Sequence, residues 1–277
     1  MTTEATPGRV NVMDYAGKEF LLNLDRAERA EFYRLLEEAP WEGGTASGHW
    51  QVRDLCGHMI DVTEGYLERF AAAREGREVP PPLGLRIMAE KLDEGARRFR
   101  GLSKEEAIAR LKTGSDRLFE IFDALDEQSW AGEMVPHVYM GPLPAFFFAA
   151  FQLIDYAIHG WDIKAGLGRD EPLSDAAALT LIPFMLIVIQ YTIDAEQAGD
   201  LKTRFGIEIE GPGGGTWCVD VDGPTVSYAE GATEGCEVVF DFKPSEFVLF
   251  TYQRTSNGAV RGDADLAERL RHLLFKI

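Results

Sequence analysis

The sequence contains few cysteines and no long apolar run, and each shortage excludes a class of protein. Its three cysteines, Cys56, Cys218 and Cys236, form no C-x-x-C pair. The sequence therefore predicts neither a disulfide framework nor a cysteine-rich zinc site. The apolar run at residues 184–193 is shorter than the roughly 20 residues that a membrane-spanning helix needs.

Basic side chains are also scarce relative to acidic ones. The chain has 28 lysines and arginines against 46 aspartates and glutamates, a formal net charge of −18. Such a chain repels phosphate backbones and anionic lipids, so we expect neither nucleic acid nor a membrane as partner. A small anionic substrate requires arginines placed locally in its pocket. The first residues lack the basic and apolar regions of a signal peptide, and we expect a cytoplasmic protein.

Helical periodicity dominates the first two hundred residues. Apolar positions recur at helical spacing among charges, and an apolar helix follows Ser174, an expected N-cap, with a kink expected at Pro183. The predicted helices are Lys18–Glu38, Val52–Ala73, Leu85–Arg100, Lys104–Ala124, Leu143–Leu167 and Ser174–Ala198. Residues 136–144 are expected to be irregular. A hydrophobic fraction of 45% is typical of a globular protein with a core.

The pattern changes near residue 200. Short β-rich runs alternate with glycine-rich turns, and two helical patterns close the chain. The predicted strands and helices are Phe205–Glu210, Thr216–Val221, Thr225–Ala229, Glu237–Phe242, Pro244–Gln253 and Asp263–Phe275. We therefore predict an α plus α+β protein, with a helical bundle over residues 1–199 and a small α+β domain over residues 200–277.

Three side chains have the chemistry of a catalytic metal site. Asp155 and His159 are four residues apart in QLIDYAIHGWD, so they project from one face of the predicted helix. His58 lies in another apolar segment, WQVRDLCGHMID. Two imidazoles and one carboxylate can hold a divalent metal and leave positions open for water or substrate. A lone helical histidine is more often structural; the joint occurrence of the three favours the metal site.

WQVRDLCGHMID resembles the W-x-V-R-D-L-x-x-H segment of the mycothiol-dependent maleylpyruvate isomerase family, a branch of the DinB-like four-helix-bundle superfamily. QLIDYAIHGWDIKAGLG is similar to that family's acidic-x-x-x-H-x-x-D-L segment, and the C-terminal TYQRTSNGAVRGDADLAERL resembles the small sterol-carrier-like domain often joined to such bundles. The resemblance implies a divalent metal, usually zinc, held by His58, Asp155 and His159, and a low-molecular-weight thiol, mycothiol in actinobacterial relatives.

The resemblance also implies a reaction. A metal-bound thiol is deprotonated, and in the isomerase the thiolate would add to the double bond of a small cis enedione acid, allow rotation and leave. The C-terminal domain of the family contributes an arginine, and Arg254 in TYQR matches it best; a guanidinium suits a substrate carboxylate. The sequence departs from the family in carrying Asp155 where glutamate is more common, and His49 where P-G-W is usual.

Several alternatives stay open at this point. The same scaffold would serve a thiol S-transferase, in which the thiol remains on the product, or a non-catalytic carrier of a metal or an apolar molecule. Asp162 would either orient a ligand imidazole or pair with an arginine. His49, His137 and Arg261 are read as solvated surface or loop residues. The oligomeric state is expected to be a monomer or a small homo-oligomer.

Overall fold

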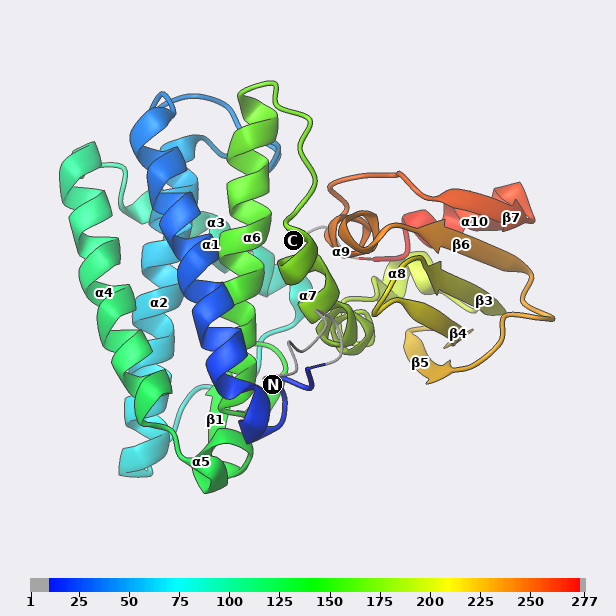
Figure 1. Ribbon diagram of the computed structural model, residues 1–277, viewed down its shortest axis with the longest axis horizontal. Coiled ribbons are helices and arrows are strands. Elements are labelled where there is room, and N and C mark those ends of the chain that lie inside the picture. Colours follow the sequence, from blue (N-terminus) through cyan, green and yellow to red (C-terminus); the bar gives the residue numbers. More distant parts are fainter. Residues whose placement is uncertain (1–9, 275–277) are drawn as a thin grey trace, which may run out of the picture. The chain divides into compact units, whose positions relative to one another are not determined.

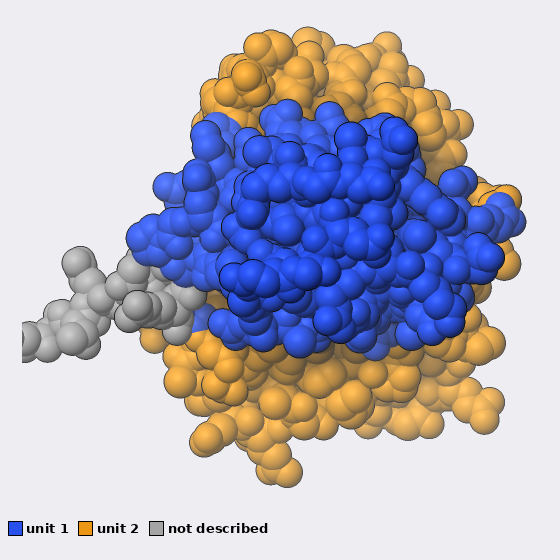
Figure 2. All heavy atoms as spheres, turned by 90° about the vertical axis from the view of Figure 1, so that its right-hand side faces the viewer, with its two compact units in different colours: residues 1–10, 172–277 blue, residues 11–171 orange. Residues whose placement is uncertain are grey.

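The computed structural model describes residues 10–274 (Figure 1). The chain divides into two compact units, which Figure 2 colours separately. Asn11–Glu171 form one unit, here called the helical unit, and the described residues 172–274, together with Val10, form the other, here called the C-terminal unit. Within residues 10–274, no helix is both long enough and apolar enough to cross a membrane.

Four long helices run side by side in the helical unit (Figure 1). Helix α1 packs along α6, and α2 packs along both α4 and α3. A short hairpin, β1 with β2, precedes α6 and contacts α2. The elements are η1 Tyr15–Gly17, α1 Lys18–Glu38, α2 Val52–Glu75, α3 Leu85–Arg98, α4 Lys104–Ala124, α5 Glu127–Gly132, β1 Met134–His137, β2 Gly141–Pro144 and α6 Phe146–Gly166.

The ends of these helices follow from local sequence. Ser103 caps α4 by accepting a hydrogen bond from the Glu106 N–H, and the Glu106 carboxylate accepts one in return from the Ser103 N–H. This reciprocal pair satisfies two backbone donors at the start of a helix. Helix α2 ends at Gly76, whose φ of 65° is in the left-handed region that glycine adopts without a steric penalty.

The C-terminal unit consists of a five-stranded sheet with helices. The strand order is β5-β4-β3-β6-β7, in which only the β3–β6 pair is parallel. Helix α7 packs against α9, and buried phenylalanines such as Phe240 and Phe247 fill the interior. The elements are α7 Asp175–Val188, α8 Ala195–Ala198, β3 Lys202–Ile209, β4 Gly215–Asp222, β5 Thr225–Glu230, β6 Val238–Phe242, α9 Pro244–Thr251, β7 Ala259–Gly262 and α10 Ala264–Arg271.

The predicted fold class, helices followed by an α+β part, is confirmed. The single helix predicted from Ser174 to Ala198 is wrong, because the chain leaves the helix after Val188 and starts α8 with Asp194 as N-cap. The stretch at residues 136–144, predicted as irregular, belongs mostly to the β1–β2 hairpin. The predicted domain boundary near residue 200 stays a prediction: it follows the change from helix to strand, whereas the two units group residues by packing.

Candidate metal centre

Helices α2 and α6, which contact each other, carry the three residues of the candidate centre. His58 lies in the second turn of α2, and Asp155 and His159 lie four residues apart on α6. Each residue offers one ligand atom such that all three atoms lie within 4.8 Å of one another. The sequence prediction that these residues share a site therefore has the required geometry in the structure.

The two imidazole rings of the candidate centre contact each other edge to face. Their ring centroids are 4.9 Å apart, and the rings are nearly perpendicular at 84°. His58 and His159 are buried, with 6% and 7% of their surface exposed, whereas Asp155 is half-buried. The centre thus lies within the packed helices, with Asp155 as its most accessible member.

A second carboxylate orients His159. Its Nδ1 lies 2.9 Å from Oδ2 of Asp162, one helical turn later, and Asp162 is fully buried. A carboxylate bonded to Nδ1 leaves Nε2 as the nitrogen for a metal and raises the basicity of the ring. The contact with His159 is the one expected if Asp162 orients a ligand imidazole.

The loop of residues 41–50 covers the imidazoles with an aromatic ring. The Trp50 ring centroid lies 5.1 Å from that of His58 and 6.2 Å from that of His159. Trp50 Nε1 donates a hydrogen bond of 2.9 Å to Oδ1 of Asp93 on α3, and His49 Nε2 lies 2.6 Å from the same oxygen. Loop and α3 together therefore hold Trp50 over the site.

Burial dominates the electrostatics of the centre. It raises the pKa of the Asp155 carboxyl to about 6, although the neighbouring His159 lowers it. Burial, together with the Asp155 carboxylate, also raises the pKa of Tyr139 in the β1–β2 turn. Tyr139 thus keeps its proton and is a hydrogen-bond donor in the vicinity of Asp155. A cation at the centre would stabilise the ionised Asp155.

The donor set fits a divalent metal. Two imidazole nitrogens and one carboxylate oxygen are ligands that zinc binds in catalytic sites, and a carboxylate bonded to a ligand histidine is a common companion of such sites. His58, Asp155 and His159 would be the ligands, with Asp162 behind His159.

Other residues singled out in the sequence lie elsewhere. The His137 ring is buried among Tyr139 and Phe151, 4.8 and 4.9 Å away between ring centroids, and is not the solvated loop side chain that was expected. Arg261 pairs on the sheet surface with Asp241 and Glu208. Arg254 lies in the C-terminal unit just after α9, where its Nη1 donates to the Tyr252 carbonyl.

Sequence reasoning missed two residues near the centre. The contact of Trp50 with the two imidazoles, at interplanar angles of 40° and 47°, needs the loop to reach α3, which no local pattern reveals. Tyr139 sits in a turn that was expected to be irregular. The signal that could have found both is the same: an aromatic side chain with a polar group, in a loop next to a histidine motif.

The fold and the candidate centre define the class of protein: a helical bundle in which two histidines and an aspartate lie close enough to share a metal ion. A family model described as the mycothiol maleylpyruvate isomerase N-terminal domain matches residues 24–164, just over half of the chain. The chain belongs to this family.

Solved structures agree on the fold. A crystal structure of the mycothiol-dependent maleylpyruvate isomerase is 19% identical, with a TM-score of 0.59, over 87% of this chain and 91% of that one. A histidine-to-alanine mutant of that enzyme is 16% identical, with a TM-score of 0.61 and the same coverage. The colibactin self-resistance protein ClbS, solved with double-stranded DNA, covers 55% of this chain at 14% identity and a TM-score of 0.43, and that chain is covered to 93%. No curated protein sequence matches the chain.

Proposed function

We propose that the protein is a metal-dependent and thiol-dependent isomerase of the maleylpyruvate isomerase type, acting on a small electrophilic acid. The observation that carries the proposal is the convergence of His58, Asp155 and His159, whose ligand atoms lie within 4.8 Å of one another. Family membership supports mycothiol as the thiol, and the donor set supports zinc. A cytoplasmic location remains a prediction from the sequence.

The residues of the centre would have separate tasks. A bound divalent metal supplies an electrostatic field that lets a coordinated thiol lose its proton at neutral pH. His58, Asp155 and His159 would hold the metal, and Asp162 would keep the His159 ring in the correct tautomer. Trp50 and the surrounding apolar side chains exclude water, which strengthens every charge interaction inside. Tyr139 donates a hydrogen bond to a substrate oxygen, and Arg254 is proposed to bind the substrate carboxylate.

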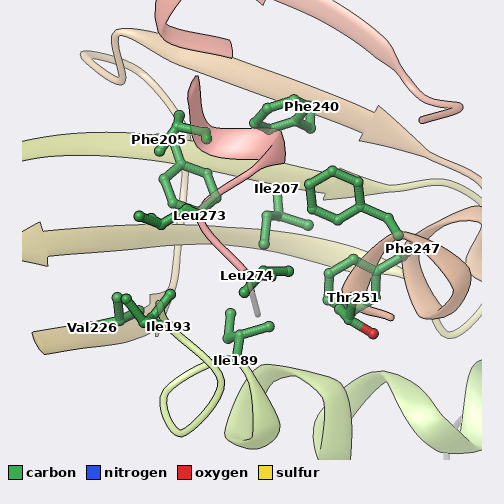
Figure 3. Close-up of a pocket in the computed structure, with 12 residues that line it drawn as sticks. Ile189, Ile193, Phe205, Ile207, Val226, Phe240, Phe247, Thr251, Leu273 and Leu274 are labelled. Carbon is green, nitrogen blue, oxygen red and sulfur yellow. The ribbon is translucent and has the colours of Figure 1, made fainter. Parts of the chain in front are cut away.

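Two other functions were considered from the sequence. A thiol S-transferase uses the same centre and differs only in whether the thiol leaves the product. A carrier of apolar molecules would use the interior of the C-terminal unit, whose apolar cavity is lined by residues such as Ile189, Phe205 and Phe240 (Figure 3). Its volume of about 20 Å³ suffices for little more than one water molecule, so the isomerase is favoured over the carrier.

Elemental analysis followed by an activity assay tests the proposal. Purified protein should contain about one divalent metal ion per chain, and the double variant His58→Ala plus His159→Ala should lose it. With mycothiol and maleylpyruvate, the metal-loaded protein should consume the cis isomer, followed by its absorbance. His272→Ala, which removes an exposed histidine of the C-terminal unit, should change neither result.

The outcomes separate the candidate functions. Stoichiometric metal without turnover, together with a mycothiol adduct of the substrate detected by mass spectrometry, would replace the isomerase by the transferase. Metal that persists in the double variant would contradict the centre itself.

A further inference from the structure

Two cysteines that are 18 residues apart in the sequence meet on the sheet of the C-terminal unit. The sulfur of Cys218, on β4, lies 3.6 Å from the sulfur of Cys236, in the turn before β6. Both side chains are half-buried and both are free thiols. The sulfurs are in van der Waals contact, about 1.5 Å farther apart than in a disulfide bond. The sequence, read by spacing alone, gave no sign of this pair.

A glycine on the strand between them makes the contact possible. Gly206 on β3 is the register partner of Cys218 on β4. A Cβ added at Gly206 would lie 2.7 Å from Cγ2 of Thr233. Because Gly206 has no side chain, the turn of residues 231–236 can lie across β3 and bring Cys236 to Cys218.

Hydrogen bonds hold this turn in place at both ends. The Gly231 N–H donates to the Thr216 carbonyl at 3.0 Å, and the Glu237 N–H donates to the Arg204 carbonyl at 3.0 Å. Inside the turn, the Cys236 N–H donates to the Thr233 carbonyl. The distance between the two sulfurs is therefore set by a tethered turn and not by a freely moving loop.

The two thiols differ in their surroundings. Burial and the neighbouring Cys218 raise the pKa of Cys236 to about 11, although the Arg204 guanidinium lowers it. Arg204 interacts electrostatically with both sulfurs while it pairs with Asp220 at 2.7 Å. Burial therefore favours the protonated form of Cys236 at neutral pH.

We propose that Cys218 and Cys236 form a reversible dithiol–disulfide site that low-molecular-weight disulfides oxidise. The Cys218 thiol releases its proton to solvent, and the thiolate attacks one sulfur of the disulfide RSSR. This forms a mixed disulfide and expels RS⁻. Cys236 then loses its proton and attacks the Cys218 sulfur, which forms the protein disulfide and expels the second RS⁻. The two RS⁻ take up the two protons, so two protein thiols are oxidised and RSSR is reduced to two RSH.

Oxidised glutathione is a suitable probe on the full chain. After exposure, the protein is unfolded in denaturant with N-ethylmaleimide, and its intact mass should show one alkylated cysteine, two cysteines that have become unreactive, and no retained glutathione. Trypsin leaves both cysteines in one peptide, because Lys243, the one lysine between Arg204 and Arg254, precedes Pro244. Cleavage after Glu230 and Glu234 separates them, so the disulfide appears as a linked peptide pair that reduction releases.

Cysteine variants test the order of the reaction. Cys236→Ser should retain one glutathione on Cys218, whereas Cys218→Ser should react far more slowly. Cys56 is fully buried in the helical unit, and burial raises its pKa to about 12, so Cys56→Ala should leave the result unchanged. Circular dichroism confirms that each variant is folded. Stable glutathione on the wild-type protein, three unreacted thiols, or a disulfide between chains would each overturn the proposal.

Two glycine substitutions test whether the short distance between the two sulfurs controls the reaction. Gly206→Ala should displace the turn and slow closure of the disulfide by about ten- to hundredfold, since ring closure depends on positioning. Gly231→Ala is the matched control, because a Cβ there meets nothing within 4 Å. Equal closure rates in the two variants would show that the contact at 3.6 Å does not control the reaction.

Discussion

Asp162 is a fully buried carboxylate that lies behind His159, a proposed metal ligand, with Oδ2 2.9 Å from Nδ1 of that ring. A carboxylate there fixes the ring orientation and the tautomer at once. We expect Asp162→Asn to weaken metal affinity by about 10–100-fold, because the amide keeps the size but loses the charge. Zinc titration against a chelating indicator measures the change.

The exposed Asp170→Asn, in the loop after α6, is the control and should bind metal as the wild type does. Circular dichroism at 222 nm should be unchanged in both variants. Equal affinity of Asp162→Asn and wild type would mean that Asp162 acts only in packing.

Asp25 on α1 is a second buried carboxyl group, and burial of its ionised form destabilises the folded protein. Neither oxygen has a hydrogen-bond partner among the described residues. Burial raises its pKa well above the ordinary value; Arg29 and Arg26 lower it, and Asp155 adds to the increase. The folded protein therefore favours the neutral carboxyl group, and stability is lost as pH rises from about 4, the unfolded value, towards the folded pKa.

Asp25→Asn should remove this dependence. The asparagine cannot ionise, so the slope of unfolding free energy against pH should change by up to about 1.4 kcal/mol per pH unit, the value for one proton. Urea unfolding of metal-free protein between pH 5 and 8, roughly the range in which folded proteins are most stable, measures the slope. Glu19→Gln, an exposed position of the same helix, should change stability little. A parallel pH profile for Asp25→Asn and wild type would refute the argument.

Helices α2 and α3 approach closely at Gly57, the residue before His58, which is a proposed metal ligand. A Cβ at Gly57 would lie 2.1 Å from the Ala96 carbonyl oxygen, whereas a Cβ at Gly65 on the same helix meets nothing within 4 Å. Gly57→Ala must separate the helices and move His58, and we expect a loss of about 1–3 kcal/mol in the free energy of unfolding. Gly65→Ala should instead stabilise by up to about 1 kcal/mol through helix propensity.

Denaturant unfolding and metal titration together check this pair. Metal affinity should fall in Gly57→Ala and stay unchanged in Gly65→Ala. If both substitutions stabilise the protein, the close approach at Gly57 does not constrain the two helices.

Helices and strands could be predicted from the sequence where periodicity and end-capping residues mark them locally. The bounds of Lys18–Glu38 and Lys104–Ala124 were predicted correctly, because amphipathic periodicity and, at Ser103, a capping box agree there. The β1–β2 hairpin was missed because its prolines, such as Pro136 and Pro142, supply no ladder donors and suggest a loop. The end of α7 at Val188 was also missed, because no glycine or proline follows it in residues 189–194.

In the candidate site, too, some features could be predicted from local sequence and others could not. The ligand spacing on α6 is a property of one helix and is readable from sequence. The Trp50–Asp93 hydrogen bond and the Cys218–Cys236 contact each join segments that are far apart in the chain. Only packing brings such pairs together, and no spacing rule anticipates it.

Charge is a property of the whole chain. With a net charge of −18, the chain is repelled electrostatically by a polyanion. We expect no binding of a fluorescent DNA duplex, by anisotropy, with a dissociation constant tighter than about 100 µM at physiological salt, the weak end of ordinary non-specific binding. A basic protein of known DNA affinity serves as positive control. Binding that falls steeply with added salt would contradict this expectation.

Asp162 holds the centre in a second way, through its backbone. Its carbonyl oxygen accepts a hydrogen bond from the Ala46 N–H of the covering loop, and Gly166 lets that loop lie against the end of α6. Asp162 therefore contacts both His159, a proposed metal ligand, and the loop of residues 41–50 that covers the imidazoles. Lifting the loop would uncover the imidazoles and disturb the support of His159 together, so the residence time of a bound ion should follow the opening rate of the loop.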